Sequence, residues 1–400
     1  MLGVLAETAD SQDGAARLAA LSALPAPSGE ATSIVSYRSA GQTAIIGPLD
    51  RARAAALALA ATSGELQCTL LVPPEAAGSG PRSSETPEND GNGAGPRTIF
   101  AKLVALRGHL GQFEIDMEFE GEVRPLAPSL VTAHRPFDLV LDLSEPAMLD
   151  AEIPPPGYVA AGPGGDEAQH LARAAGELAE LVGEFDKPRY FNYEPDICAH
   201  GRSGQPGCTR CIDACPANAI ASLEETIEVD PHLCQGGGSC ASACPTGAIE
   251  YAYPGPADQS NRLARMLADY LERASNPPTL LFHDGEAGLE WLVPRLSSLP
   301  GSVLPWQVEE VGSVGMDIWL SALAHGAGRV AVLCPAVVPS TVMAELRFQA
   351  GVARRIATSL GLDEDALVLV PVAPATAPPA ILAEPAPAAI RPPARFAATG

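Results

Sequence analysis

Residues 208–220 read Cys-Thr-Arg-Cys-Ile-Asp-Ala-Cys-Pro-Ala-Asn-Ala-Ile, and residues 237–249 read Gly-Gly-Ser-Cys-Ala-Ser-Ala-Cys-Pro-Thr-Gly-Ala-Ile. Laid over each other at an offset of 29 residues, the two runs share two cysteines, the proline after the second of these and the closing isoleucine. Cys234 stands three residues before the second run, where its first cysteine would fall. The repeat predicts two copies of one short loop, each of which gathers several thiols.

This duplication resembles the bacterial two-cluster ferredoxin, whose C-x2-C-x2-C-x3-C-P motif gives three thiolates to one iron–sulfur cluster and a fourth to the other. Soft sulfur binds iron strongly, and the short spacing lets one loop wrap three corners of a cluster. The resemblance implies that the first cluster is bound by Cys198, Cys208, Cys211 and Cys244. It implies that the second is bound by Cys215, Cys234 and Cys240.

The first run departs from the ferredoxin pattern at its first cysteine. Gln205 occupies that position, and Cys198 lies seven residues earlier, so that C-x2-C has become C-x9-C. The nine intervening residues are rich in turn formers and can bulge out without moving either thiolate far. We therefore keep Cys198 as a ligand, with His200 in reserve, although a histidine in a loop is more often simply exposed.

The second run departs at Gly237, which offers no ligand atom where the second cysteine belongs. Three readings follow: a [3Fe–4S] cluster, a [4Fe–4S] cluster with one iron held by water or an outside ligand, or a lost second cluster. We favour a three-thiolate cluster because its other cysteines are all present. A zinc site fits poorly, because it needs four ligands in two close pairs, whereas the C-x3-C-P repeat follows each run.

Composition narrows the function and the compartment. A net charge of −23 argues against a nucleic-acid partner, which needs clustered Lys and Arg, and suits either docking on a basic redox partner or a solvated surface. Seven of nine cysteines fall within residues 198–244, which is typical of a metal centre in a reducing compartment. Cys68 and Cys334 fit better as core residues.

No secretory signal or apolar run of about 20 residues is present. We therefore expect a cytoplasmic protein without membrane insertion.

The flanking segments alternate strands and helices, which favours parallel sheets. We expect an α/β fold with an inserted α+β two-cluster ferredoxin module and parallel α/β domains on both sides. The predicted parts are an α/β domain over 1–185 with a disordered insertion at 73–97, the ferredoxin module over 186–254, a parallel α/β domain over 255–372 and a disordered Pro/Ala-rich tail over 373–400. In the third part, strands are expected at 279–282, 303–309, 329–333 and 366–370, and helices at 259–273, 286–296, 316–324 and 340–360.

Two further resemblances concern the function. The stretch 190–215 resembles cytoplasmic 4Fe-4S binding proteins found beside formate dehydrogenases. Residues 308–317 and 324–333 are similar to the small iron–sulfur subunit of hydrogenase–heterodisulfide reductase complexes, although Cys334 is the one candidate for that family's own cysteines. We expect an electron-transfer protein that serves a cytoplasmic oxidoreductase complex, with formate dehydrogenase as the candidate partner. The alternatives are a flavin- or substrate-binding oxidoreductase subunit, and an iron–sulfur sensor or maturation factor that uses the three-thiolate cluster.

Overall fold

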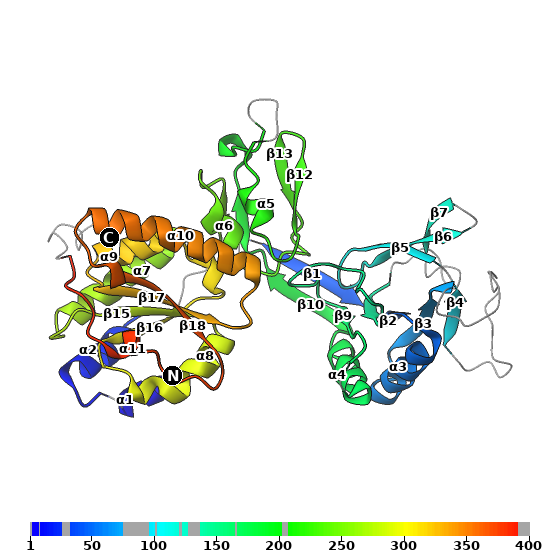
Figure 1. Ribbon diagram of the computed structural model, residues 1–400, viewed down its shortest axis with the longest axis horizontal. Helices are drawn as coiled ribbons and strands as arrows, with labels where there is room; N and C mark the ends of the chain where they lie inside the picture. The colour runs from blue at the N-terminus through cyan, green and yellow to red at the C-terminus, as the bar shows by residue number, and fades with distance from the viewer. Residues whose placement is uncertain are drawn as a thin grey trace. The chain divides into compact units, whose positions relative to one another are not determined.

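The computed structural model describes residues 2–7, 9–25, 33–74, 96–100, 102–119, 122–126, 137–164, 166–201 and 207–390. They form two compact units, one made of Ile34–Lys187 and the other of Met1–Ser33 together with Pro188–Gly400 (Figure 1). Most of the predicted disordered insertion, residues 75–95, lies outside the described residues. In the described part of the chain, no helix is long and apolar enough to cross a bilayer.

The unit Ile34–Lys187 is built on a parallel sheet with the strand order β4-β3-β2-β8-β9. Its strands are β2 (Gln42–Ile46), β3 (Gln67–Val72), β4 (Arg97–Phe100), β8 (Leu139–Asp142) and β9 (Tyr158–Ala160). Ile45 in the central strand lies opposite Leu70 and Leu141 on its two neighbours. These strands are short runs of apolar residues because a parallel sheet is covered on both faces.

The two faces of this sheet are covered differently. Helices α3 (Leu49–Thr62) and α4 (Glu167–Ala179) pack on one face. A three-stranded antiparallel sheet of β5 (Lys102–Arg107), β6 (Glu114–Phe119) and β7 (Glu122–Leu126) packs on the other. The alternating pattern from Phe113 to Phe119 predicts β6, and the structure confirms that strand.

An apolar stripe that includes Leu171, Leu178 and Phe185 predicts a helix over residues 166–185, and this helix begins as expected but ends early. The Asp166 side chain caps α4 by accepting a hydrogen bond from the Gln169 amide at 3.2 Å. Gly183 has a φ of +132°, which a helix cannot contain, and the chain continues as strand β10 (Gly183–Pro188). This strand pairs with β1 (Ile34–Ser39). The apolar stripe of the sequence therefore runs on past the true end of the helix.

The C-terminal part of the other unit is a four-stranded parallel sheet with the order β16-β15-β17-β18. Its strands are β15 (Thr279–His283), β16 (Val303–Gln307), β17 (Arg329–Pro335) and β18 (Leu367–Val372). Its helices are α7 (Pro256–Leu271), α8 (Ala287–Leu292), α9 (Met316–Ala324) and α10 (Ser340–Ser359), with 3-10 turns at Val293–Ser298, Val311–Ser313 and Glu364–Ala366. The predicted alternation of four parallel strands with helices is confirmed.

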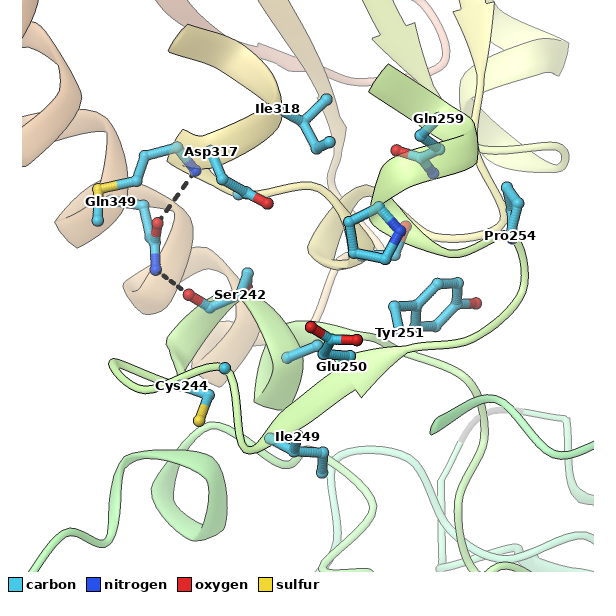
Figure 2. Close-up of a pocket in the computed structure, with 16 residues that line it drawn as sticks. Ser242, Cys244, Ile249, Glu250, Tyr251, Pro254, Gln259, Asp317, Ile318 and Gln349 are labelled. Carbon is cyan, nitrogen blue, oxygen red and sulfur yellow. Dashed lines mark hydrogen bonds between the residues drawn. The ribbon is translucent and has the colours of Figure 1, made fainter. Parts of the chain in front are cut away.

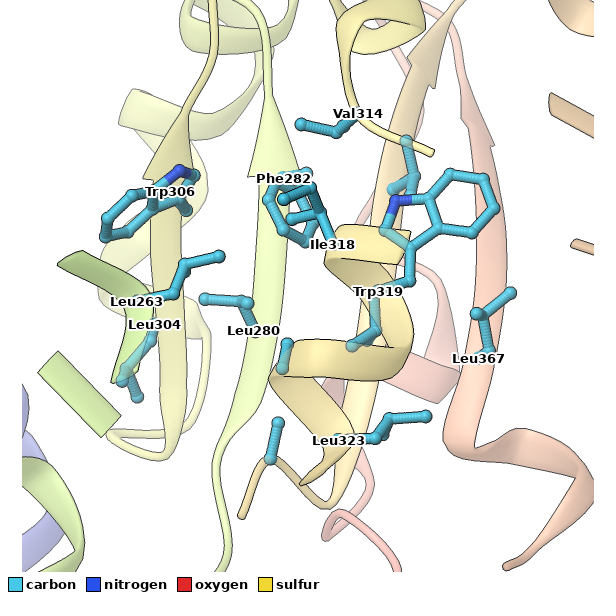
Figure 3. Close-up of a cluster of buried hydrophobic side chains, with 14 of the residues drawn as sticks. Leu263, Leu280, Phe282, Leu304, Trp306, Val314, Ile318, Trp319, Leu323 and Leu367 are labelled. Carbon is cyan, nitrogen blue, oxygen red and sulfur yellow. The ribbon is translucent and has the colours of Figure 1, made fainter. Parts of the chain in front are cut away.

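A large core fills one face of this sheet. Trp306, Phe282 and Trp319 lie side by side between the strands and the helices, with Trp319 wholly buried (Figure 3). Helices α7, α9 and α10 close this face, whereas α8 and its following 3-10 turn pack on the opposite face. The sheet is thus held from both sides, and the loops at the carboxyl ends of its strands are fixed by a rigid framework.

Two terminal segments differ from the prediction. Helices α1 (Leu2–Glu7) and α2 (Gln12–Ser22) belong to the C-terminal unit, because Leu5 enters its core and the buried Arg17 guanidinium donates to the carbonyl oxygens of Pro300 and Val303 at 3.1 and 3.3 Å. The expected mobile tail is packed over residues 373–390 and contains α11 (Ala380–Ala383). Residues 391–400 lie outside the described part.

The ordered part of the tail follows from one buried cation. The Arg329 side chain is 2% exposed and donates to the carbonyl oxygens of Ile381 and Glu384 at 2.7 and 3.1 Å. Leu382 is fully buried beside the sheet. A buried guanidinium needs several acceptors, and here the tail backbone supplies them. The proline and alanine content alone does not reveal this pairing.

Candidate metal centres

The duplicated cysteine runs fold as two similar loops on a small α+β frame. The frame consists of two antiparallel pairs, β11 (Phe191–Tyr193) with β14 (Ile249–Tyr251) and β12 (Ile220–Leu223) with β13 (Thr226–Val229). Two short helices, α5 (Arg210–Asp213) and α6 (Ser239–Ala243), contain Cys211 and Cys240, and the other cysteines lie in the adjoining loops. The repeat extends to the backbone, because Asn218 and Gly247, which are equivalent at the 29-residue offset, have φ values of +50° and +69°.

The first set of thiols lines one cavity. Its members are the four cysteines predicted to bind the first cluster, Cys198, Cys208, Cys211 and Cys244. Burial raises the pKa of the Cys211 thiol to about 11, and the charges of the other three contribute to the rise. Four thiols that oppose one another's ionisation form an unfavourable group by themselves, and a cationic core that all four could share would relieve it.

The loop between Cys198 and Cys208 shows how a nine-residue spacing still brings two thiols together. The Cys208 amide donates to the Ala199 carbonyl at 3.2 Å, and the Gly207 amide donates to the His200 carbonyl at 2.5 Å. These two bonds close the base of the loop directly beside both cysteines. The described ends of the loop therefore meet beside both cysteines, whereas the expected bulge falls mainly on residues 202–206, which lie outside the described part.

His200 is not available as the reserve ligand. Its side chain is 1% exposed, Nδ1 lies 2.8 Å from the Cys208 carbonyl oxygen, and Nε2 lies 2.7 Å from Ser222 Oγ. Both ring nitrogens are thus occupied. The expectation of an exposed loop histidine is wrong, since this one ties the loop to strand β12 and fixes the backbone of Cys208.

Backbone amides stabilise charge on Cys244, which comes from the second run but lies in the first set. Burial raises the pKa of its thiol, yet hydrogen bonds from the Ile249, Thr246 and Ala248 amides outweigh burial, and the net pKa lies below its ordinary value. The Thr246 hydroxyl lies 3.6 Å from the sulfur. Such N–H···S contacts favour the thiolate that a metal requires.

The second set contains the thiols of Cys215, Cys234 and Cys240. Burial raises the pKa of Cys240 well above its ordinary value, and the charges of Cys234, Cys215 and then Cys211 contribute to the rise. The Ala219 amide donates to the Cys215 sulfur at 3.3 Å. The two sets adjoin each other, because Cys211 of the first lies within the electrostatic environment of Cys240.

Gly237 stands at the position where this second set lacks a thiol. A Cβ atom built on it would lie 3.6 Å from the Pro216 ring, an ordinary contact. Gly236 and Gly238 on either side differ, since their φ values are +77° and +72°. A Cβ on Gly238 would also come within 2.4 Å of Ser313 Cα. The backbone therefore requires glycine at Gly238 but would accept a side chain at Gly237.

Two tyrosines and a group of carboxylates lie near this second set. The rings of Tyr190 and Tyr251 stack with centroids 6.2 Å apart, and the Tyr251 hydroxyl donates to the Gly236 carbonyl at 3.1 Å. Burial raises the pKa of Tyr190 to about 12, with a further contribution from the charges of Glu309 and Cys234. Both tyrosines thus lie near Cys234 of the second thiol set and near the acidic Glu309.

Helix α10 is hydrogen-bonded to both α5 and α6, the two short helices of the cysteine runs. The sequence does not suggest these contacts. Arg210, next to Cys211, donates to both carboxylate oxygens of Glu345 at 2.7 and 2.9 Å and to the Ala243 carbonyl at 3.0 Å. Its guanidinium lies 4.4 Å from the centre of the Phe348 ring. Both contacts to Glu345 come from one guanidinium nitrogen, Nη2, so they form a single charge-assisted link between α5 and α10.

Gln349 makes the second bridge. Its amide nitrogen donates to the Ser242 carbonyl, and its amide oxygen accepts a hydrogen bond from the Met316 amide at 3.1 Å, so that one side chain joins α10, α6 and α9 (Figure 2). The only sequence signal is that Glu345 and Gln349 lie one helical turn apart on the same face. Their partners are visible only in the folded chain.

The donor sets fit iron–sulfur clusters. All nine cysteines are free thiols, so none of the seven is consumed by a disulfide. Among the described residues, no group of three or more His, Cys, Asp or Glu side chains closes on a point that one metal ion could occupy. Cys68 is half-buried in β3 and Cys334 is buried in β17, where burial raises its pKa to about 12. A thiol of this kind is inert.

Comparison with known proteins gives a match over the same region. Residues 205–248 match the 4Fe-4S dicluster domain family, a stretch that contains every cysteine of the two sets except Cys198. An 80-residue stretch is 34% identical to one subunit of the ion-translocating oxidoreductase complex of Methanosarcina acetivorans, covering 20% of this chain and 28% of the relative. The match thus spans little more than a quarter of that relative's length. The protein therefore carries a 4Fe-4S ferredoxin-type domain within a mixed α/β fold with parallel sheets.

Proposed function

We propose that this chain is an iron–sulfur electron-transfer protein with two unlike clusters. The first is a [4Fe–4S] cluster on Cys198, Cys208, Cys211 and Cys244. The second is held by Cys215, Cys234 and Cys240, either as [3Fe–4S] or as [4Fe–4S] with one iron open to an outside ligand. The observation that carries the proposal is the exchange of cysteines between runs: Cys244 lines the cavity of the first set, and Cys215 lies with the second.

This exchange favours electron transfer over a purely structural role. Because each run contributes to both sets, the two clusters would be held side by side by the same short segments. An electron that enters at one cluster would then have a neighbouring acceptor within the module. The amide hydrogen bonds to Cys244 and Cys215 would adjust the reduction potential of each cluster. Any chemistry on a substrate would take place in a partner.

The partner in this proposal is a multi-subunit oxidoreductase. The relative from Methanosarcina acetivorans, named as a subunit of an ion-translocating oxidoreductase complex, supports a role of this kind. Formate dehydrogenase is the more specific candidate that the sequence suggests. In this arrangement the ferredoxin module stands between two α/β domains along the chain, and these domains would dock the partner. Nine free thiols suit the cytoplasm.

A sensor or maturation factor is the second candidate, and Gly237 is the observation that favours it. A cluster with three protein thiolates can exchange its fourth iron, and Gly237 leaves one corner of the second set without a protein ligand. Iron that is removed by a chelator from one cluster, while the other persists and no electron passes between them, would favour this function.

The test of electron transfer is anaerobic purification of the full chain followed by iron and sulfide analysis and a reductive titration. We expect a coloured protein with two separable one-electron steps, and EPR signals that show interaction between two centres. A colourless, iron-poor preparation would contradict the proposal. So would a single redox step that accounts for all the iron.

A further inference from the structure

A cavity of about 270 Å³ lies where the ferredoxin module meets the C-terminal α/β domain, outside both thiol sets (Figure 2). Helix α6 and strand β14 form one wall, and the first turns of α7 and α9 form the other. Cys244 lines this cavity as well as the cavity of the first thiol set. A molecule bound here would therefore lie beside the proposed first cluster.

The charged side chains of the lining have one sign. None of its 16 residues is Lys, Arg or His, whereas two are carboxylates, Glu250 on β14 and Asp317 in the first turn of α9. Both side chains point into the space between the two walls in Figure 2. No ion pair to either is present in the described part of the chain. A bound group is therefore expected to be positive.

A buried amide gives independent support. Gln259, in the first turn of α7, is 3% exposed, yet its side chain makes no hydrogen bond within the described residues. Its amide points into the cavity and faces Asp317 across it (Figure 2). Because the amide atoms of Gln259 line the cavity and are not sealed from solvent, they can bind a molecule that enters it. An N–H donor in the cavity would satisfy the oxygen of Gln259 and pair with the carboxylates at the same time.

Apolar surface completes the lining. Ile249, Ile318 and two prolines, Pro254 and Pro256, form much of the remaining wall. The space is larger than a bare metal ion needs, and two carboxylates are few ligands for one. An alkyl chain that ends in a charged nitrogen matches both parts, because its methylene groups would cover the apolar wall while its head reaches the carboxylates.

We propose that this cavity binds an organic cation, a primary ammonium or guanidinium group on an alkyl stem. The cation comes either from a small free amine or from a basic side chain of another protein. Its positive charge beside Cys244 favours the reduced form of the first cluster. By reciprocity, reduction of that cluster tightens cation binding. This second part rests on the proposed electron-transfer function; the binding itself does not.

The test uses the cluster-loaded full chain at low ionic strength, with binding measured by calorimetry. The probes are n-butylamine for a free amine, N-acetyl-lysine methylamide for a protein side chain, and N-acetyl-norleucine methylamide as the uncharged control. We expect the two amines to bind and the norleucine compound not to bind. Tighter binding of the lysine compound identifies a protein side chain as the source, and equal binding identifies a free amine.

Two double variants each remove two negative charges, one pair inside the cavity and the other pair away from it. Glu250→Gln with Asp317→Asn should weaken amine binding by about fivefold for each carboxylate, as expected for loss of about 1 kcal/mol per ion pair. Glu272→Gln with Glu290→Gln, two exposed carboxylates away from the cavity, should leave binding unchanged. Equal affinity in the two double variants would overturn the cavity proposal, as would binding of the norleucine compound with the affinity of the amines.

The reduction potential of the first cluster gives the second readout. Saturating butylamine should shift it to a more positive value in the unaltered chain and in the Glu272/Glu290 variant, but not in the Glu250/Asp317 variant. The two proposals can fail separately. An iron-free chain that still binds amines through Asp317 would contradict electron transfer and leave the cavity site intact. A normal redox titration without selective amine binding would contradict the cavity proposal and leave the electron-transfer proposal intact.

Discussion

The two thiol sets come from one repeated sequence but differ in completeness and surroundings. The first has four thiols around one cavity and is joined to helix α10 through Arg210. The second has three thiols, an open position at Gly237 and two nearby tyrosines, Tyr190 and Tyr251. In a duplicated fold, each half can thus keep its backbone while it changes its ligand chemistry. Under the proposed function, the first set would hold a stable electron carrier, whereas the second would leave one corner of its cluster to an outside ligand.

The sharpest way to separate the two sets is to remove one thiol from each. Cys211→Ala should abolish the first cluster and Cys240→Ala the second, because each belongs to one set and a three-thiolate site cannot spare a further ligand. The EPR signal and iron lost from Cys211→Ala, added to those lost from Cys240→Ala, should therefore equal the total signal and iron of the unaltered chain. Cys68→Ala is the control and should keep both clusters. Loss of the same signals from both cluster variants would contradict the assignment.

A side chain at Gly237 should make the two sets alike. Gly237→Cys places a thiol at the open corner without a steric conflict, so we expect a [4Fe–4S] cluster with four protein thiolates there. An oxidised EPR signal near the free-electron value, which a three-iron cluster gives, should disappear, and chelators should no longer extract iron from this site. Unchanged spectra would mean that position 237 does not face the cluster.

Gly238→Cys is the matched control for that experiment. Its φ of +72° and the approach of its Cβ to Ser313 mean that any side chain forces the backbone to move. The strain should destabilise the protein by about 1–3 kcal/mol and add no ligand. If Gly238→Cys behaved like Gly237→Cys, a nearby thiol rather than a specific corner would explain the result.

The link between the first set and α10 should contribute to stability more modestly. Arg210→Gln removes the charge-assisted link to Glu345 and the bond to the Ala243 carbonyl, at an expected cost of about 1–2 kcal/mol. Urea unfolding followed by cluster absorbance measures this change, and the first cluster should bleach at lower urea than the second. Arg355→Gln, an exposed position on the same helix, should have no such effect. Equal bleaching of both clusters would contradict a selective link.

The acidic region near the second set should appear in the pH dependence of stability. Partial burial, followed by the charges of Asp284, Glu286 and Glu309, raises the pKa of Glu310 from 4.5 to about 7. The folded state therefore binds more protons than the unfolded chain between these values, and stability falls as pH rises from 4.5 to 7. Glu310→Gln should flatten this part of the profile in thermal melts. An unchanged slope would show that Glu310 ionises normally.

The spacing of the repeat was enough to predict which four cysteines line one cavity. The repeat placed six thiols in register, and the turn-rich residues after Cys198 led us to expect this cysteine beside Cys208, where the described ends of the loop meet. His200 was misjudged because a histidine's surroundings depend on a distant strand, here through Ser222. Glu345 and Gln349 were missed because nothing in a helical sequence identifies a partner more than 100 residues away.

The fold was predicted to a similar extent. In the C-terminal domain each strand is a distinct apolar run between helices, so all four strands and their parallel pairing followed from alternation. Domain membership was harder, because helices α1 and α2 join that domain through the buried Arg17, a contact across 283 residues. The tail was misread since its order depends on Arg329 and not on its own composition.

The central claim is that one duplicated loop holds two unlike clusters, and Mössbauer spectroscopy of the full chain, purified without oxygen from ⁵⁷Fe-enriched cells, tests it most directly. We predict two components: a [4Fe–4S] cluster with equivalent thiolate ligation, and a second cluster with either three irons or one iron distinct from the other three. A spectrum of a single uniform cluster type, or a chain that contains no iron–sulfur species, would contradict the account.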